Sequence, residues 1–165
     1  MAIKSLWRET KMAIKFNSPA FKHGEPIPAK YTCDGQNVSP ALQWEGLPDG
    51  TKTVAIILED PDAPSGTFIH WIIYDIPVNI TSLQEGVTSS MNLPDGAAMG
   101  TNDARRIGYY GPCPPSGVHH YHFRLYALKN YLRLDAGATR KELDLEMKDH
   151  ILGQAEVMGT YKRER

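Results

Sequence analysis

The chain has 165 residues, of which 41% are hydrophobic and 22% charged, which is typical of one globular domain with a sizeable core. Its net charge of -1 gives no general attraction to nucleic acid or to an anionic membrane surface. The sequence has no long uncharged apolar run, so it predicts no transmembrane segment. Any bound anion must therefore be held by a local site.

The first fifteen residues do not form a secretory signal, because charged side chains interrupt them and no apolar stretch develops. The opening tetrapeptide recurs from Met12 onward. Two interpretations stay open: Met12 is the original start and residues 1–11 are an extension, or the segment is a native tail or an edge strand. We expect residues 1–12 to be a flexible N-terminal extension and residues 13–165 to form a single domain. Without a targeting sequence, the expected location is cytoplasmic.

The first predicted elements are strands. Short strands are expected around Phe16, around Tyr31 and over residues 42–44. The next two strands, over residues 53–60 and 68–76, are apolar at both odd and even positions. That pattern is typical of strands that are covered on both faces.

A further strand, predicted over residues 118–128, alternates between two faces. One face carries His119, Tyr121, Phe123, Leu125 and Ala127, and the other carries His120, His122, Arg124, Tyr126 and Leu128. His119 therefore points to the opposite side of the strand from His120 and His122.

One helix follows, because Thr139 and Glu142 have the spacing of a capping box. Its apolar stripe is interpreted as core and consists of Leu143, Met147 and Ile151. A last strand is predicted over residues 155–162. Many short strands, frequent turn signals and one late helix favour a mainly β domain of two packed antiparallel sheets.

Two loop segments rich in proline and glycine each lead into a strand that carries histidine. The first covers residues 60–66 and leads to His70, and the second covers residues 108–117 and leads to His119. Loops that are held by a rigid scaffold often carry binding and catalytic groups. We therefore expect these segments to form the two halves of one polar pocket.

The acidic residues of the first loop need partners. Asp60 and Asp62 follow a buried strand, where an ionised carboxylate without a hydrogen-bonded partner is costly. His70 and His119 are the expected partners. A carboxylate beside an imidazole raises the pKa of the imidazole. Tyr121 adds a hydroxyl on the strand face of His119. The expected result is one or two cationic histidines held rigidly, in a pocket suited to phosphate, sulfate or carboxylate.

Gly111 and Pro112 complete the expected pocket, because glycine lets a ligand approach the backbone and proline fixes the loop. The expected ligand-binding residues are thus Asp60, Asp62, His70, Gly111, Pro112, His119 and Tyr121. His120 and His122 face the other way and are assigned to solvent or packing.

Other chemistries have less support in the sequence. Ser65 and Ser116 lack the surroundings of a nucleophile elbow, so Asp60 and His119 would have no positioned nucleophile. No nucleotide-binding motif is present. A metal held by Asp60, His70 and His119 stays a minority alternative, and we expect neither a metal nor a cofactor.

Cys33 and Cys113 are the only cysteines. In a reducing cytosol the first expectation is two free, partly buried thiols. Both lie in loop segments beside the expected pocket, so a disulfide stays open if their Cα atoms lie within about 7 Å.

At these loops the chain closely resembles the phosphatidylethanolamine-binding proteins, also called Raf kinase inhibitor proteins. Residues 60–64 followed by His70 resemble the first signature of that family, and residues 111–121 resemble the second. Further segments resemble its bacterial and archaeal branch, namely residues 31–35, residues 38–40, Trp44 and residues 155–161. The resemblance covers about residues 14–163.

The resemblance implies a large central antiparallel β-sheet packed against a smaller sheet, with peripheral helices that include one near the C-terminus. It implies a non-enzymatic binding protein whose anion pocket accepts phosphate or phosphorylated head groups, with a cis peptide before Pro64. Eukaryotic relatives bind kinases and others inhibit serine proteases, so a kinase or protease partner stays open, as does a homodimer. The chain stops at Arg165 without the further C-terminal helix of the mammalian proteins, which implies a more open pocket.

We therefore expect a small anionic or phosphorylated ligand as partner, and no nucleic acid. Two alternatives are kept. One is a serine protease inhibitor that acts through surface loops such as residues 91–106, and it rests on analogy alone. The other is a hydrolase that uses Asp60 and His119.

Overall fold

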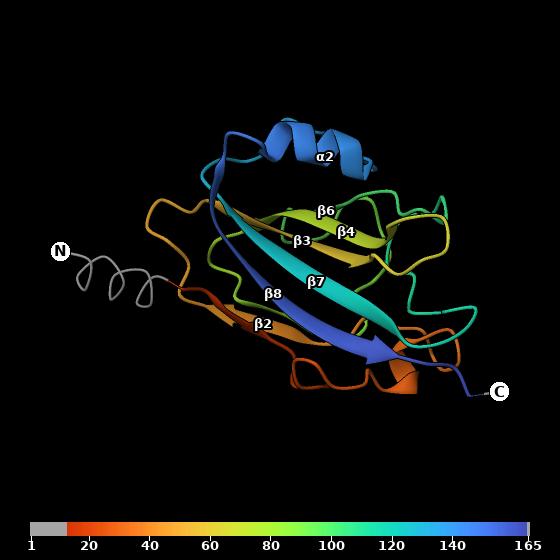
Figure 1. Cartoon of the computed structure of the whole chain (residues 1–165). Coiled ribbons are helices and arrows are strands. Elements are labelled where there is room, and N and C mark those ends of the chain that lie inside the picture. The colour runs from red at the N-terminus through yellow and green to blue at the C-terminus, as the bar shows by residue number, and fades with distance from the viewer. Residues whose placement is uncertain (1–12, 165) are drawn as a thin grey trace.

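A five-stranded antiparallel sheet lies between a smaller three-stranded sheet and an α-helix in the computed structural model, which describes residues 13–164 (Figure 1). The strands are β1 (Lys15–Asn17), β2 (Leu42–Glu45), β3 (Thr53–Asp60), β4 (Phe68–Pro77), β5 (Ser82–Leu83), β6 (Ala98–Met99), β7 (His119–Leu128) and β8 (Ile151–Tyr161). The helical elements are the 3-10 helix η1 (Ala29–Tyr31) and α2 (Arg140–Met147). The prediction of a mainly β fold with two antiparallel sheets and a late helix is confirmed.

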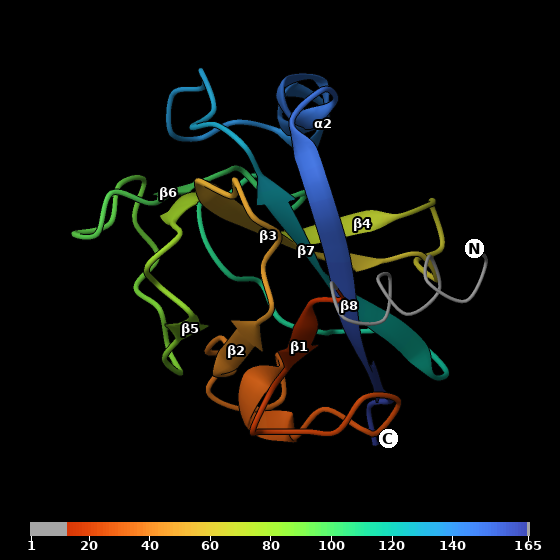
Figure 2. The same ribbon diagram turned by 90° about the vertical axis from the view of Figure 1, so that its left-hand side faces the viewer.

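The order of strands places β3 at the centre of the large sheet. The large sheet has the order β6-β4-β3-β7-β8, and the small sheet has the order β1-β2-β5. Figures 1 and 2 show the small sheet on the side of the large sheet opposite α2. The large sheet is therefore covered on both faces over its central strands.

The central strand β3 contributes to two hydrophobic cores. Val54, Ile56 and Leu58 pack between the two sheets, whereas Ala55 and Ile57 pack beneath α2. None of these five side chains has exposed surface. This two-sided burial is the physical reason for apolar residues at both odd and even positions, as the sequence predicts.

Helix α2 begins with the predicted capping box. The Thr139 hydroxyl accepts a hydrogen bond from the Glu142 backbone N–H, and the Glu142 side chain accepts one from the Thr139 backbone N–H. Leu143 and Met147 are buried against the large sheet, as predicted. The inclusion of Ile151 in this stripe is wrong, because the chain turns after Met147 and Ile151 begins β8 with 41% of its surface exposed.

Two other predictions differ from the structure. Tyr31 lies in η1 rather than in a strand, because its backbone N–H donates to the carbonyl of Pro28 and closes a tight helical turn. The last strand begins at Ile151 rather than at residue 155, because β8 pairs with β7 along its whole length. The expected N-terminal extension at residues 1–12 lies outside the described residues.

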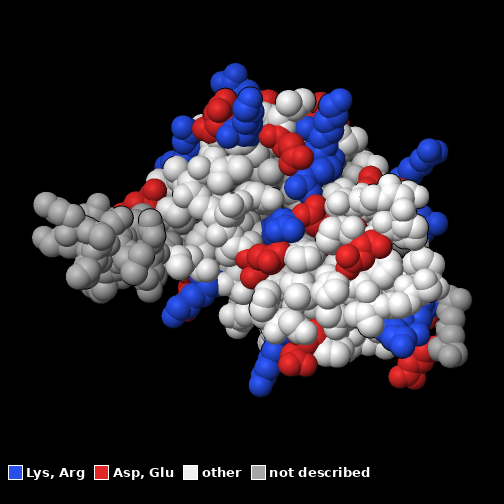
Figure 3. Space-filling view, viewed as in Figure 1, with Lys and Arg blue, Asp and Glu red and all other residues white. Residues whose placement is uncertain are grey.

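Charges of both signs are mixed on the face of the molecule shown in Figure 3. Figure 3 shows basic and acidic side chains interspersed over one face, in agreement with the net charge of -1. Over residues 13–164, no helix has both the length and the apolar character that a membrane crossing requires.

Candidate functional site

A cavity of about 160 Å³ opens where the chain leaves β3 and enters β4 and β7. Its walls are formed by Asp60, Ala63, Pro64, Phe68, His70, Tyr110, Cys113, Pro114, Pro115, His119 and Tyr121. Four of the predicted site residues are thus brought together, namely Asp60, His70, His119 and Tyr121. Asp62, Gly111 and Pro112 are not among the residues that line the cavity.

Antiparallel pairing brings the polar side chains to one edge of the large sheet. Asp60 ends β3 and pairs with Phe68 at the start of β4. Because β7 is antiparallel to β3, the first residues of β7, which include His119, come beside the last residues of β3. The two loops therefore meet at this edge, as the sequence predicts.

Asp60 holds His119 through a buried hydrogen bond. His119 Nδ1 lies 2.6 Å from Asp60 Oδ2, and both side chains are almost fully buried. Asp60 Oδ1 accepts a second hydrogen bond, of 2.8 Å, from the backbone N–H of Asp62. An ionised carboxylate can only accept hydrogen bonds, so His119 Nδ1 carries the proton in this pair. The structure pairs the two residues as the sequence predicts.

His70 has a carbonyl rather than a carboxylate as its partner. Its Nδ1 lies 2.6 Å from the backbone carbonyl oxygen of Tyr110. Burial lowers the pKa of His70 below its ordinary value of 6.5, although the Tyr110 carbonyl and the charges of Asp60 and Asp103 oppose this shift. The expectation of a raised pKa and a cationic ring is therefore wrong for His70, because desolvation outweighs the nearby acids.

Tyr121 brings a buried hydroxyl to the cavity, and the residue has no exposed surface. Asp60 and the backbone of Cys113 lie near this hydroxyl, but no group among the described residues forms a well-aligned hydrogen bond with it. Burial raises the pKa of Tyr121, so the hydroxyl keeps its proton and can donate. A buried polar group without a partner costs about 1–3 kcal/mol, which a ligand oxygen at this position would relieve.

Asp62 points away from the cavity and binds the outer face of β7. Its Oδ2 accepts hydrogen bonds from the backbone N–H of His120 at 2.8 Å and from His120 Nδ1 at 2.7 Å. These hydrogen bonds hold the pKa of Asp62 below its usual range. His122 is likewise bonded to Glu156 on the same face. His120 and His122 thus belong to the outer surface, as predicted.

Gly111 allows the close approach of another protein loop. A Cβ atom at this position would lie 2.3 Å from Oδ1 of Asn37 and 2.4 Å from the carbonyl oxygen of Tyr31. The Gly111 N–H also donates to Asn37 Oδ1 at 2.9 Å. The sequence assigned this close approach to a ligand, whereas the structure gives it to the segment between β1 and β2.

A disulfide joins the same two loops. The Cα atoms of Cys33 and Cys113 are 5.4 Å apart and their sulfur atoms are bonded, so the first expectation of two free thiols is wrong. The Cys33 N–H donates to the Pro112 carbonyl at 3.1 Å, and the Tyr109 hydroxyl donates to the Tyr31 carbonyl at 2.6 Å. Pro112, the residue before Cys113, therefore holds the segment of Cys33 through its backbone carbonyl.

Two aromatic residues of the wall are missing from the sequence-based set. The centroid of the His70 ring lies 4.8 Å from that of Phe68 and 5.7 Å from that of Tyr110. Strand periodicity is a signal for Phe68, because residues two apart on a strand share a face. Pro64 also lines the cavity, but the described residues contain no cis peptide bond, which contradicts the expected cis bond before it.

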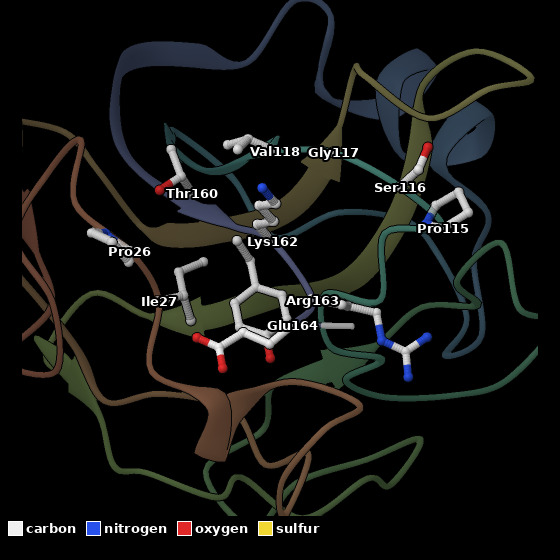
Figure 4. A pocket seen from close by; sticks show the side chains of 11 residues that line it. Pro26, Ile27, Pro115, Ser116, Gly117, Val118, Thr160, Lys162, Arg163 and Glu164 are labelled. Carbon is white, nitrogen blue, oxygen red and sulfur yellow. The ribbon is translucent and has the colours of Figure 1, made fainter.

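A larger hollow of about 790 Å³ adjoins the cavity and shares Pro115 with it. Figure 4 shows this hollow with Pro26 and Ile27 on one side and residues 115–118 on the other, and with Lys162 between them. Open space therefore continues from the cavity past Pro115.

The cavity offers binding groups rather than the parts of a nucleophilic site. Within residues 13–164, no group of three or more His, Cys, Asp or Glu residues is arranged to hold a metal ion. The residues lining the cavity in this range include no serine or threonine, and the sulfur of Cys113 is in the disulfide. Two imidazole rings and two phenol side chains, those of Tyr110 and Tyr121, line the cavity and suit an oxygen-rich group.

Comparison with known proteins extends over nearly the whole chain. The sequence family described as phosphatidylethanolamine-binding protein matches residues 17–162. The UPF0098 protein of Methanothermobacter thermautotrophicus is 49% identical over 144 residues, which cover 87% of this chain and 95% of that protein. The UPF0098 protein of Pyrococcus horikoshii is 48% identical over 159 residues, which cover 94% of this chain and 79% of that protein.

Two crystal structures have a similar fold. A phosphatidylethanolamine-binding protein homologue from Chlamydia trachomatis matches with a TM-score of 0.86 and 39% identity, over 93% of this chain and 99% of that chain. Escherichia coli YbcL, described as a new member of the mammalian family, matches with a TM-score of 0.85 and 32% identity, over 92% of this chain and 99% of that chain. The chain therefore belongs to the phosphatidylethanolamine-binding protein family, a membership that supports a non-enzymatic protein of the binding type.

Proposed function

We propose that the cavity binds a small anion such as phosphate, or the phosphorylated head group of a larger molecule. The observation that carries this proposal is the convergence of His70, His119 and the unpartnered hydroxyl of Tyr121 on one buried cavity. A few polar groups that converge within a largely apolar pocket are typical of a ligand site. Membership of a family of binding proteins adds support.

The size of the cavity limits what enters it. Pockets that enclose a drug-sized ligand have volumes of roughly 300–1,000 Å³. The cavity has about 160 Å³, which suits a phosphate-sized group but not a nucleotide or a whole lipid. In a larger ligand, only the anionic head would occupy the cavity, and the rest would lie toward the hollow at Pro115.

Titration calorimetry with inorganic phosphate tests this proposal. The Tyr121→Phe variant removes the unpartnered donor, and we expect it to raise the Kd for phosphate by roughly tenfold. The matched control is Tyr126→Phe, because Tyr126 lies on the opposite face of β7, and we expect its Kd to equal that of the wild type. A wild type that binds no phosphate, or equal Kd values for Tyr121→Phe and Tyr126→Phe, would count against the proposal.

The two alternatives have less support. A hydrolase that uses Asp60 and His119 needs a nucleophile, and the cavity wall supplies none from serine, threonine or a free thiol. Inhibition of a protease would require residues 91–106 to present an extended loop to the protease. That segment is folded back on itself by hydrogen bonds such as those from Met99 N–H to the Met91 carbonyl and from Leu93 N–H to the Ala97 carbonyl.

A further inference from the structure

We propose that Asp62 is a positioning residue of the cavity, which acts from the outer face of β7 and holds the Asp60 carboxylate and the cavity wall at residues 63–64 in the geometry that binds the anion. This inference rests on the proposed function and adds to it a residue that does not touch the ligand. Asp62 does not line the cavity, and its side chain is 39% exposed. Its role follows from the place where the pairing of β3 with β7 ends.

Main-chain pairing between β3 and β7 stops one step before the loop that carries Asp62. The last pair joins Glu59 to His122, so the same register would place His120 opposite Pro61. Proline has no N–H to give to such a pair, so it does not continue the ladder. The backbone N–H of His120 is bound instead by the Asp62 carboxylate, at 2.8 Å.

Two carboxylates fasten this loop to the two faces of β7. On the outer face, Asp62 Oδ2 accepts from the His120 backbone N–H and also lies 2.7 Å from Nδ1 of the His120 ring. On the inner face, Asp60 Oδ2 binds His119 Nδ1 at 2.6 Å. The backbone N–H of Asp62 donates to Asp60 Oδ1 at 2.8 Å and thereby links the two carboxylates.

This link determines how the Asp60 carboxylate is oriented. Asp60 is almost fully buried, and its two oxygens bind His119 Nδ1 and the Asp62 N–H respectively. His119 Nδ1 carries a proton toward the carboxylate whether the ring is neutral or charged, so the link does not depend on the charge of His119. If the loop moved, Oδ1 would lose its partner in a buried position, which is costly, and the carboxylate would be free to turn.

Asp62 also places the part of the cavity wall that follows it in the chain. Ala63 and Pro64 line the cavity directly after Asp62. Another hydrogen bond of the loop, from Gly66 N–H to the Ala63 carbonyl at 3.1 Å, lies within the loop and does not fix it against β7. Loss of the Asp62 carboxylate should therefore let the wall and Asp60 move, while β3 stays paired with β4 and β7.

Titration calorimetry with inorganic phosphate compares the wild type with Asp62→Ala and Asp62→Asn. Alanine removes the acceptor, and we expect it to raise the Kd for phosphate by roughly five- to tenfold. Loss of a negative charge alone would favour an anion and lower the Kd, so a rise reports lost positioning. Asparagine keeps an oxygen that accepts from the His120 N–H, and we expect its Kd to stay within about twofold of the wild type.

The matched control is Glu156→Ala. Glu156 binds His122 on the same outer face of β7, but it belongs to β8 rather than to the loop. The control therefore removes the same charge and a similar hydrogen bond without releasing the cavity wall. We expect its Kd for phosphate to equal that of the wild type.

Nitrogen-15 NMR of the histidine rings measures the position of His119 without a ligand. In the wild type we expect the Nδ1 proton of His119 to exchange slowly with water, because it is buried and bonded to Asp60. We expect Asp62→Ala to accelerate this exchange severalfold and Glu156→Ala to leave it unchanged. A general loss of stability would instead accelerate exchange in strands far from the loop as well.

The inference is supported if Asp62→Ala raises both the Kd and the exchange rate while Glu156→Ala and Asp62→Asn change neither. Equal values for Asp62→Ala and Glu156→Ala would overturn it, and so would an equal rise of the Kd in Asp62→Asn and Asp62→Ala. If Asp62→Ala does not fold, Asp62→Glu takes its place, because the longer side chain keeps the charge but displaces the carboxylate. A wild type that binds no phosphate would overturn the proposed function, and the exchange rate of His119 would still decide whether Asp62 positions that ring.

Discussion

Two histidines share one cavity but are held by different kinds of partner. His119 is bonded to a carboxylate, which carries a full charge, and His70 is bonded to a backbone carbonyl, which carries only a partial charge. A carbonyl offsets little of the desolvation that a buried imidazolium suffers, so His70 resists protonation. The ionisation of His70 is therefore linked to folding.

We expect the protein to lose stability as the pH falls below about 6.5, in part because of His70. The pKa of His70 is lowered in the folded state, so the unfolded chain takes up the proton first as the pH falls. Proton uptake therefore favours the unfolded state below this pH. Above this range both states hold a neutral ring and His70 adds no pH dependence. Urea unfolding at about pH 7.5 and about pH 5.5 measures the loss, which should be smaller in His70→Gln.

The control for this measurement is His150→Gln, whose histidine is partly exposed and lies outside the cavity. It should lose as much unfolding free energy as the wild type between the two pH values. If His70→Gln and the wild type showed the same loss, the link between His70 and folding would be refuted.

At the scale of single residues, sequence reasoning reached part of the site. The pairing of Asp60 with His119 was predictable, because a carboxylate at a buried strand end needs a partner and histidine follows the second loop. The partner of His70 was not predictable, since it is a backbone carbonyl that depends on the path of the chain at Tyr110. The role of Gly111 was not predictable either, because its neighbour Asn37 comes from a segment that is distant in the sequence.

At the scale of elements, an ion-pair group fastens α2 to the large sheet. Glu59, on the face of β3 away from the cavity, accepts hydrogen bonds from Arg124 of β7 and from Arg140 of α2, the latter at 2.8 Å. Burial alone raises the pKa of Glu59, but the hydrogen bonds and charges of the two arginines outweigh it and hold the pKa below its usual range. Neighbouring residues of β3 thus serve two purposes, Glu59 docking the helix and Asp60 orienting His119.

We expect Glu59→Gln to lower the free energy of unfolding by about 1–3 kcal/mol at neutral pH, because two guanidinium groups lose their common partner. The folded-state pKa of Glu59 is lowered, so its contribution is present above its unfolded pKa and disappears as the pH falls through the folded pKa. Chemical unfolding at neutral and acidic pH should therefore show the gap between wild type and variant closing in acid.

Glu45→Gln provides the comparison, because Glu45 forms an exposed pair with Lys15 at 3.8 Å. Exposed pairs contribute little, so this variant should unfold like the wild type. A similar, small effect of both substitutions would mean that the group at Glu59 does not hold the helix.

Hydrophobic pattern and capping were good guides to the elements. The two-sided burial of β3 and the capping box of α2 could be predicted, because each depends on residues that are close in sequence. The prediction of a strand around Tyr31 was wrong because a tertiary contact decides the local backbone conformation there. The Tyr31 hydroxyl donates to Glu85 at 2.6 Å, a contact that fixes the end of η1 and that no local pattern indicates.

At the scale of the whole molecule, the cavity wall depends on two loops that are far apart in the sequence. The segment between β1 and β2 reaches the loop before β7 through the disulfide and through hydrogen bonds from Gly111 N–H to Asn37 and from Tyr109 to Tyr31. This proximity results from the packing of the small sheet on the large one. The sequence therefore left the pairing of Cys33 with Cys113 open.

The disulfide should stabilise the whole domain more than it shapes the cavity. It joins residues 80 apart in the sequence, so it restricts the unfolded chain strongly, and we expect Cys33→Ser/Cys113→Ser to lose about 2–4 kcal/mol of unfolding free energy. The hydrogen bonds from Gly111 to Asn37 and from Tyr109 to Tyr31 remain, so the folded variant should keep its phosphate affinity within about tenfold. Urea unfolding of the oxidised wild type, the wild type reduced with dithiothreitol and the variant measures the loss, and the last two should agree. If the double variant had the same unfolding free energy as the oxidised wild type, the disulfide would not constrain the unfolded chain as proposed.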